Sequence, residues 1–169
     1  GIATDVSSAV NYYGQAAAQG HVKATVQLGT SHASGVGVTQ SHETAVTLFR
    51  AAAEQNYHEA QKCLGVCYEN GLGVSQNETE AVKWYTLAAA QGNADAQNLL
   101  GACYATGRGV TKDVNVGVSY YNQAAEQGNP GALVNLGMCY KLGMGVEKDE
   151  VKANMVFKQA AEIMSSQNE

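Results

Sequence analysis

One stretch decides the fold: residues 96–110 read AQNLLGACYATGRGV. The same pattern recurs at residues 24–38, 60–74 and 132–146, always at a period of 36 residues and without an insertion or deletion. A fixed period of this kind is typical of a repeat protein, in which each unit buries its apolar surface against its neighbours. The structure of one unit therefore decides the structure of the array.

Each unit predicts two helices joined by a loop that contains glycine. Within residues 93–128, apolar and small residues recur at spacings of three and four, as on the buried face of a helix. The first helix, A, ends near Gly107, and the second, B, begins at Asp113 and ends before Gly128. By the period, the repeats span residues 21–56, 57–92, 93–128 and 129–164.

The residues at the predicted helix ends agree with this division. Every residue that precedes a B helix has a short polar side chain, which can accept a hydrogen bond from the first-turn backbone N–H groups. These residues are Asp5, Ser41, Asn77, Asp113 and Asp149. The B helices are predicted to end at left-handed residues, which are Gly20, Asn56, Gly92 and Gly128. Pro130, the only proline, falls in the first turn of an A helix, where it costs no hydrogen bond.

Small residues recur where the helices must approach each other closely. The chain has 19 glycines, and an alanine pair follows the aromatic position of every B helix. We expect the glycine column of the A helices to leave room for the aromatic column of the B helices. The glycine column is Gly29, Gly65, Gly101 and Gly137, and the aromatic column is Tyr13, Phe49, Tyr85, Tyr121 and Phe157.

The unit resembles the Sel1-like repeat, a helical repeat related to tetratricopeptide repeats. The resemblance rests on A-x-x-x-L-G-x-x-Y-x-x-G-x-G-V followed by A-V-x-W-Y-x-x-A-A-x-Q-G, which residues 60–92 carry almost completely, and it covers essentially the whole chain. It implies an all-α fold, a right-handed α/α superhelix (α-solenoid), whose A helices line a concave face used for protein interaction. Three residues depart from the pattern: His32, Gly117 and Asn154.

Composition and motifs argue against several classes of protein. Ten Lys and Arg and a net charge of −5 argue against a nucleic-acid-binding protein. No run approaches about 18 unbroken apolar residues, so we expect no direct membrane insertion. Ser-x-x-Lys, Ser-Asp-Asn and Lys-Thr-Gly are absent, so we expect no catalytic residue and no cofactor, although a β-lactamase-like hydrolase stays as an alternative because some members of the family are described in that way.

The four cysteines predict buried thiols that pack as small apolar groups. Cys67, Cys103 and Cys139 share one column beside the Leu and Tyr positions, and Cys63 lies one helical turn before Cys67. No metal site is expected, because zinc needs about four converging ligands and the histidines neither repeat nor pair at ligand spacing. Unpaired cysteines favour an intracellular protein, but the sequence assigns no compartment. Trp84 is expected in the core.

The predicted function is a non-catalytic interaction scaffold that binds a protein or peptide partner on the A-helix face. Val134, Met138 and Leu142, at a spacing of four, form an apolar stripe that suits docking of a partner helix. Two alternatives stay open: the stripe packs against a following repeat, or the array is a structural spacer in a multi-domain protein. The candidate binding residues are Lys62, Val66, Glu69, Asn98, Ala102, Val134, Met138, Lys141 and Leu142.

The chain is predicted to open on a B helix without its own A helix, over about residues 5–19, and to close on a tail at 165–169. This phase suggests a fragment of a longer array, because residues 1–2 align with an inter-helix loop. The leading helix is expected to expose an apolar face, through which the chain could form a homodimer. That face consists of Val6, Ala9, Val10 and Tyr13.

Overall fold

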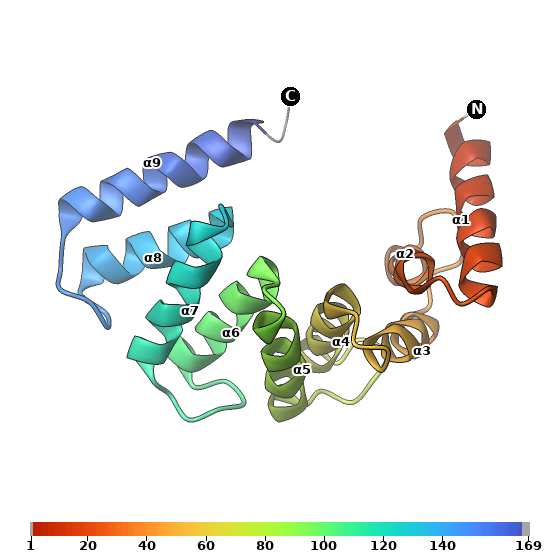
Figure 1. Ribbon diagram of the computed structural model, residues 1–169, viewed down its shortest axis with the longest axis horizontal. Helices are drawn as coiled ribbons and strands as arrows, with labels where there is room; N and C mark the ends of the chain where they lie inside the picture. Colours follow the sequence, from red (N-terminus) through yellow and green to blue (C-terminus); the bar gives the residue numbers. More distant parts are fainter. Residues whose placement is uncertain (1, 167–169) are drawn as a thin grey trace. The chain divides into compact units, whose positions relative to one another are not determined.

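The computed structural model describes residues 2–166, with side chains from Val6 onward. Within these residues the chain forms nine α-helices and no strand (Figure 1), which confirms the predicted all-α class. The helices are α1 (Ile2–Ala18), α2 (Val22–Ser34), α3 (His42–Ala53), α4 (His58–Asn70), α5 (Glu78–Ala90), α6 (Ala94–Thr106), α7 (Val114–Glu126), α8 (Pro130–Leu142) and α9 (Glu150–Ser166).

The even-numbered helices are the A helices, and the odd-numbered helices are the B helices. Two compact units divide the chain within α5, at residues 1–87 and 88–169. In unit 1, α1 packs on α2, α2 on α3 and α3 on α4. In unit 2, α6 packs on α7, α7 on α8 and α8 on α9. Within each unit, these helices pack on the next one along the chain, as the repeat pattern predicts.

An aromatic ring of each B helix packs over a glycine of its own A helix. In unit 1, a Cβ atom on Gly65 would lie 2.5 Å from the ring of Tyr85, which is fully buried. In unit 2, a Cβ atom on Gly101 would lie 2.8 Å from the ring of Tyr121. The same pairing joins Gly29 to Phe49 and Gly137 to Phe157. The predicted role of the glycine column is thus confirmed, since no larger residue fits beneath these rings.

The predicted caps form at both ends of the B helices. The side chains of Ser41, Asn77, Asp113 and Asp149 accept backbone N–H groups of the first turn at 2.9–3.2 Å. Their own backbone N–H groups donate to the preceding A helix, as from Asn77 to the carbonyl of Tyr68 at 2.9 Å. The residues that end the helices have positive φ, and they are Gly20, Asn56, Gly92 and Gly128.

The two outer helices differ from the prediction. Helix α1 begins at Ile2, so Asp5 lies inside the helix and is not its N-cap. Residues 2–4 are helical, so the first turn of α1 lies before Asp5. Helix α9 continues to Ser166 because Met164 stands where a left-handed residue ends the other B helices. Residues 167–169 of the predicted tail lie outside the described residues.

Candidate protein-interaction surface

Among the described A helices, α8 exposes the largest apolar side chains. Met138 is 40% exposed and Leu142 is 56% exposed, whereas Val134 is half-buried. The three residues lie one turn apart on one face of the helix. Lys141 is exposed beside Leu142 and carries a positive charge at the edge of this stripe. The apolar stripe predicted for the fourth repeat is therefore accessible at two of its three positions.

The equivalent positions of the earlier repeats show how much of this stripe another repeat would cover. The Leu142 position is exposed in every repeat, as Ser34, Asn70, Thr106 and Leu142. The Met138 position is half-buried at Val66 and Ala102, whereas it is exposed at Thr30. Of the three positions in the stripe, that of Leu142 is therefore the one that is exposed in all four repeats.

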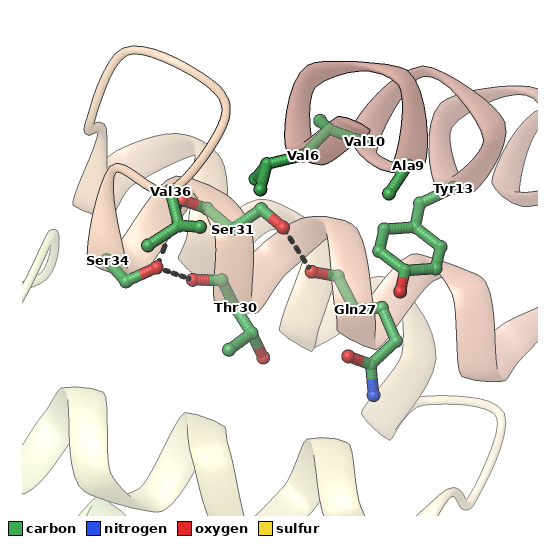
Figure 2. Close-up of a pocket in the computed structure, with 9 residues that line it drawn as sticks. All are labelled: Val6, Ala9, Val10, Tyr13, Gln27, Thr30, Ser31, Ser34 and Val36. Carbon is green, nitrogen blue, oxygen red and sulfur yellow. Dashed lines mark hydrogen bonds between the residues drawn. The ribbon is translucent and has the colours of Figure 1, made fainter. Parts of the chain in front are cut away.

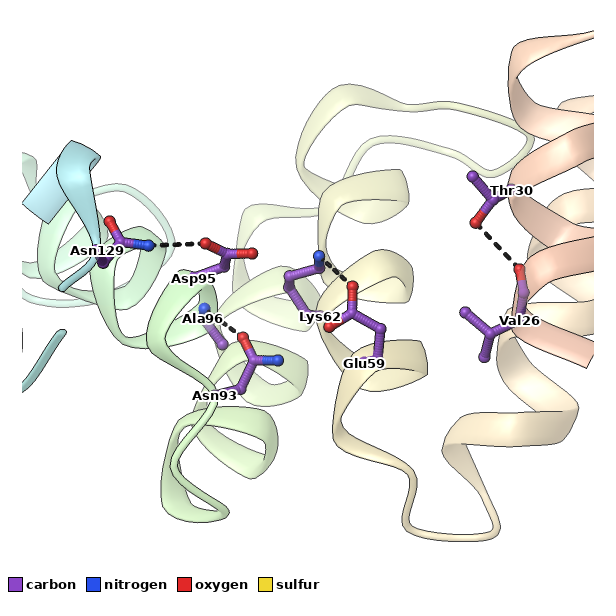
Figure 3. Close-up of polar contacts among 8 residues, drawn as sticks. All are labelled: Val26, Thr30, Glu59, Lys62, Asn93, Asp95, Ala96 and Asn129. Carbon is purple, nitrogen blue, oxygen red and sulfur yellow. Dashed lines mark hydrogen bonds and ion pairs between the residues drawn. The ribbon is translucent and has the colours of Figure 1, made fainter. Parts of the chain in front are cut away.

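In unit 2, polar contacts join the two A helices side by side. The amide of Asn135 on α8 donates to the side-chain carbonyl of Asn98 on α6 at 2.8 Å. Asn129 donates to the carboxylate of Asp95 at 2.7 Å (Figure 3). Ala102 is half-buried against the core around Val118 and Tyr121. The structure thus brings Asn98 next to the helix that carries Val134, Met138, Lys141 and Leu142.

In unit 1, the predicted candidates on α4 take part in contacts within the unit. Lys62 forms an ion pair with Glu59 (Figure 3), and the Lys62 side chain is 17% exposed. Glu69 accepts a hydrogen bond from the hydroxyl of Tyr85 at 2.8 Å. Val66 is half-buried. The ion pair lies within α4, and the hydrogen bond joins α4 to α5, so the candidates of the second repeat expose less surface than those of the fourth.

Several exposed apolar residues were not among the sequence candidates, including three at the C-terminal end of the chain. Met144 follows the Gly143 cap of α8 and is 41% exposed, and on α9 Val151 and Met155 are 73% and 66% exposed. The columns of Val151 and Met155 carried the signal, because the other repeats hold polar residues there. The column of Val151 contains Glu43, Thr79 and Asn115, and the column of Met155 contains Thr47, Lys83 and Ser119.

The prediction of an exposed apolar face on the leading helix is wrong for Val10, which is only 6% exposed. Helix α1 packs on α2 (Figure 2), and Val10 also lies against Gly37 in the loop after α2, where a Cβ atom would come within 2.8 Å of a Val10 methyl group. Val6, Ala9 and Tyr13 are half-buried. Tyr12, on another face of α1, is 69% exposed. The surface proposed for a homodimer is therefore smaller than expected and lies around Tyr13.

Two of the three residues that depart from the repeat pattern, Gly117 and Asn154, fit their surroundings. Gly117 allows a closer approach, since a Cβ atom there would lie 2.8 Å from the carbonyl oxygen of Gly101. Asn154, which replaces a core valine, is exposed on α9.

Trp84 is half-buried against the core of unit 1, as expected. Among the described side chains, Nδ1 of His32 and the indole nitrogen of Trp84 are buried without a hydrogen-bond partner.

The cysteines occupy the predicted environment. Cys67, Cys103 and Cys139 are buried, Cys63 is half-buried, and none of the four forms a disulfide. Burial raises the pKa of the Cys67 thiol to about 11 and also raises the pKa of Cys139. The reactive thiolate form of these two residues is therefore scarce at neutral pH.

We expect a thiol reagent at pH 8 to modify Cys63 much faster than the other cysteines of the folded chain. The buried thiols should react only as the chain opens, so that 4 M urea should remove the difference in rate. Mass spectrometry of alkylated peptides measures the rates separately. Modification of Cys67 as fast as Cys63 in the folded chain would contradict this prediction.

The stability of the chain should also depend on pH. Because the pKa of Cys67 is higher in the folded chain, the free energy of unfolding should fall as the pH rises from about 9 to about 11.

No helix within residues 2–166 is both long enough and apolar enough to cross a membrane. In the same residues, no group of three or more His, Cys, Asp or Glu side chains is placed to hold a metal ion.

Comparison with known proteins decides the family. The Sel1 repeat family model matches residues 1–21, 22–57, 58–93, 94–129 and 130–162. The chain belongs to the Sel1 repeat family. The helix order, the glycine–aromatic pairs and the left-handed caps described above are thus the structural counterpart of the Sel1 pattern. Curated proteins include no significant match to this Sel1 repeat chain.

Solved structures of other Sel1 repeat proteins are similar. A Sel1 repeat protein from Oxalobacter formigenes is 37% identical, with a TM-score of 0.85 over 90% of this chain and 61% of that protein. The protein c5321 of uropathogenic Escherichia coli, described as a protective antigen with an SLR fold, is 34% identical, with a TM-score of 0.81 over 90% of this chain and 33% of that protein. The immunity protein Pa5087 of Pseudomonas aeruginosa is 25% identical, with a TM-score of 0.67 over 91% of this chain and 57% of that protein. The chain thus spans less than two thirds of each of these relatives.

Sel1 repeat proteins are generally protein-interaction scaffolds, and the Sel1 repeat is a non-catalytic scaffold fold. This membership agrees with the class of function predicted from the sequence.

Proposed function

We propose that the chain is a non-catalytic scaffold that binds a partner peptide or helix on its A-helix face, mainly through α8. The exposure of Leu142 and Met138 on one face of that helix supports the proposal most directly. Exposed apolar side chains that gather on one face are typical of interaction surfaces. Methionine also adapts its shape to different partners, because its side chain is unbranched and polarizable.

The chemistry of the stripe indicates the kind of partner. An amphipathic helix would place apolar side chains on Met138 and Leu142. An acidic residue at the edge of its apolar face would lie near Lys141, which is exposed. The position of Leu142 also favours partner binding over packing against another repeat, because the equivalent residues are exposed throughout the chain.

The test uses helical peptides selected from a displayed library for binding to the full chain. We expect Leu142→Glu and Met138→Glu to weaken binding of the selected peptides at least tenfold, because each buries a charge in the interface. Val151→Glu is the matched control, since it places the same charge at an exposed apolar residue of α9. Titration calorimetry measures the affinities, and thermal unfolding measures the stability.

Two results would count against the proposal. If Leu142→Glu unfolds the chain, the stripe belongs to the core. If no selected peptide depends on Leu142 or Met138, the alternative of a structural spacer is favoured. Surface substitutions usually change the free energy of unfolding by less than about 0.5 kcal/mol, so both variants should unfold close to the temperature of the unmodified chain.

A further inference from the structure

All four methionines of the chain lie in the fourth repeat, and all of them are exposed. They are Met138, Met144, Met155 and Met164, exposed by 40%, 41%, 66% and 42%. Methionine usually fills gaps in a core, because its side chain is apolar and flexible. Here it lies at the surface of one repeat only. The fourth repeat therefore carries oxidisable thioether groups on a surface where the other repeats carry none.

Two of these methionines belong to the end of α8 that carries Leu142. Met138 lies one turn before Leu142 on the same face, and Met144 follows the left-handed Gly143 cap. The backbone N–H of Met144 donates to the carbonyl oxygen of Cys139 at 3.0 Å, so the chain turns back along the last turn of α8. Met144 is thus held at the same end of the helix as Leu142.

Exposure at these two columns also occurs in repeats that further repeats follow. Thr30, in the column of Met138, is exposed. In the column of Met144, Val36 is 54% exposed and Arg108 is exposed, whereas Leu72 is half-buried. What distinguishes the fourth repeat at these columns is therefore the chemistry of the side chain.

Most of the cysteine sulfur atoms are better protected from an oxidant. Cys67, Cys103 and Cys139 are buried, and burial raises the pKa of the Cys67 and Cys139 thiols. Peroxides oxidise the thiolate form of cysteine, whereas methionine reacts as a neutral thioether. Cys63 is half-buried and lies on α4, outside the α8 surface. Oxidation of this surface therefore takes place at methionine.

We propose that Met138 and Met144 are modification sites at which oxidation by a peroxide weakens partner binding on α8. The inference rests on the proposed function, since it concerns the regulation of the same surface. The thioether sulfur attacks one oxygen of hydrogen peroxide, so that an S–O bond forms and the O–O bond breaks. The sulfur is oxidised to a sulfoxide, and the departing hydroxide takes the proton of the transferred oxygen and leaves as water.

The sulfoxide changes what the surface can bind. Its oxygen accepts hydrogen bonds from water, which the thioether barely does. An apolar partner face laid over it would remove that water without replacing the hydrogen bond, which costs free energy. The fold should persist, because the four methionines are exposed in the folded chain.

The test compares the full chain before and after treatment with hydrogen peroxide. Catalase then removes the peroxide, dithiothreitol reverses thiol oxidation, and mass spectrometry locates the sulfoxides. Titration calorimetry measures the affinity for the selected helical peptides, chosen without Met or Cys. We expect binding at least tenfold weaker after oxidation, because each bound sulfoxide loses its hydrogen bond to water. Methionine sulfoxide reductases should restore the affinity.

Two double variants of the full chain locate the effect. Met138→Leu with Met144→Leu should bind the peptides nearly as tightly as the unmodified chain, since leucine is also apolar and of similar volume. It should keep that affinity after peroxide treatment. Met155→Leu with Met164→Leu is the matched control on α9, and it should stay as sensitive to peroxide as the unmodified chain.

A bound partner should in turn protect the surface. With saturating peptide, oxidation of Met138 should slow severalfold, whereas oxidation of Met155 on α9 should continue at its rate in the free chain. Mass spectrometry of samples taken over time measures both rates. Equal rates at Met138 with and without peptide would contradict the proposal.

Four further results would overturn the proposal. They are unchanged affinity after oxidation, loss of the helical circular dichroism on oxidation, peroxide sensitivity of the α8 double variant, and peroxide resistance of the α9 double variant. If Leu142→Glu still weakens binding in these cases, the proposed function stands and only regulation by oxidation fails. If neither Leu142→Glu nor oxidation changes binding, the proposed function fails too.

Discussion

Replacing Tyr85 with alanine should lower the free energy of unfolding by about 3–5 kcal/mol. The Tyr85 ring is fully buried over Gly65, and its hydroxyl donates to the Glu69 carboxylate at 2.8 Å. Truncation leaves a cavity that the regular backbone of α4 cannot fill, and it also removes the hydrogen bond. Urea unfolding followed by circular dichroism measures the loss.

Two further variants separate the packing of the ring from other effects. Tyr85→Phe keeps the ring and removes only the hydroxyl, so we expect a loss of about 1–2 kcal/mol. Tyr12→Ala removes a ring that is 69% exposed, and it should cost less than about 0.5 kcal/mol. Similar losses for Tyr85→Ala and Tyr12→Ala would mean that the glycine–aromatic pair does not hold α4 and α5 together.

Gly73→Ala should be the most damaging single-methyl change at a loop glycine of unit 1, at about 2–5 kcal/mol. Gly73 has φ of +71°, which costs an L-residue about 1–2 kcal/mol. A Cβ atom there would also overlap the backbone carbonyl of His42, which cannot rotate away, and overpacking adds about 1–3 kcal/mol. Thermal and urea unfolding of the full chain check the loss.

Gly20→Ala is the matched control for this prediction. Gly20 also has positive φ, +85°, but no heavy atom lies within 4 Å of its would-be Cβ atom. Only the conformational cost of about 1–2 kcal/mol should therefore appear. Gly20→Asn should cost less, because asparagine adopts the left-handed conformation at Asn56 in the same column. If Gly20→Ala destabilises the chain as much as Gly73→Ala, the close contact at His42 is not important.

Features that depend on neighbours in the chain could be predicted from the sequence. Asn77 caps α5 and Asn56 ends α3 because each side chain acts on backbone groups a few residues away. The period then extended each local assignment to all repeats. The period also carried two local assignments that are wrong. Asp5 lies inside α1 and does not cap it, and α9 continues past Met164, the position at which the other B helices end in a left-handed residue.

The candidate surface could be predicted only in part. Leu142 and Met138 are accessible as expected, because spacing along one helix determines which residues share a face. Spacing could not reveal that Glu69 accepts a hydrogen bond from Tyr85, or that Asn98 is joined to Asn135. Each of those contacts joins two different helices, so it depends on how closely the two helices pack, which the spacing along one helix does not determine.

The amino-acid sequence alone therefore determined the repeat, its helices, their caps and the residues that pack between them, since these follow from backbone preferences and from periodic apolar burial. The tertiary structure decided how much of each side chain remains accessible. Val10 is buried while Tyr13 is only half-buried, although both were predicted to belong to one apolar face of α1. Accessibility depends on which helix lies against each column, and residues close in sequence can have different neighbours in space.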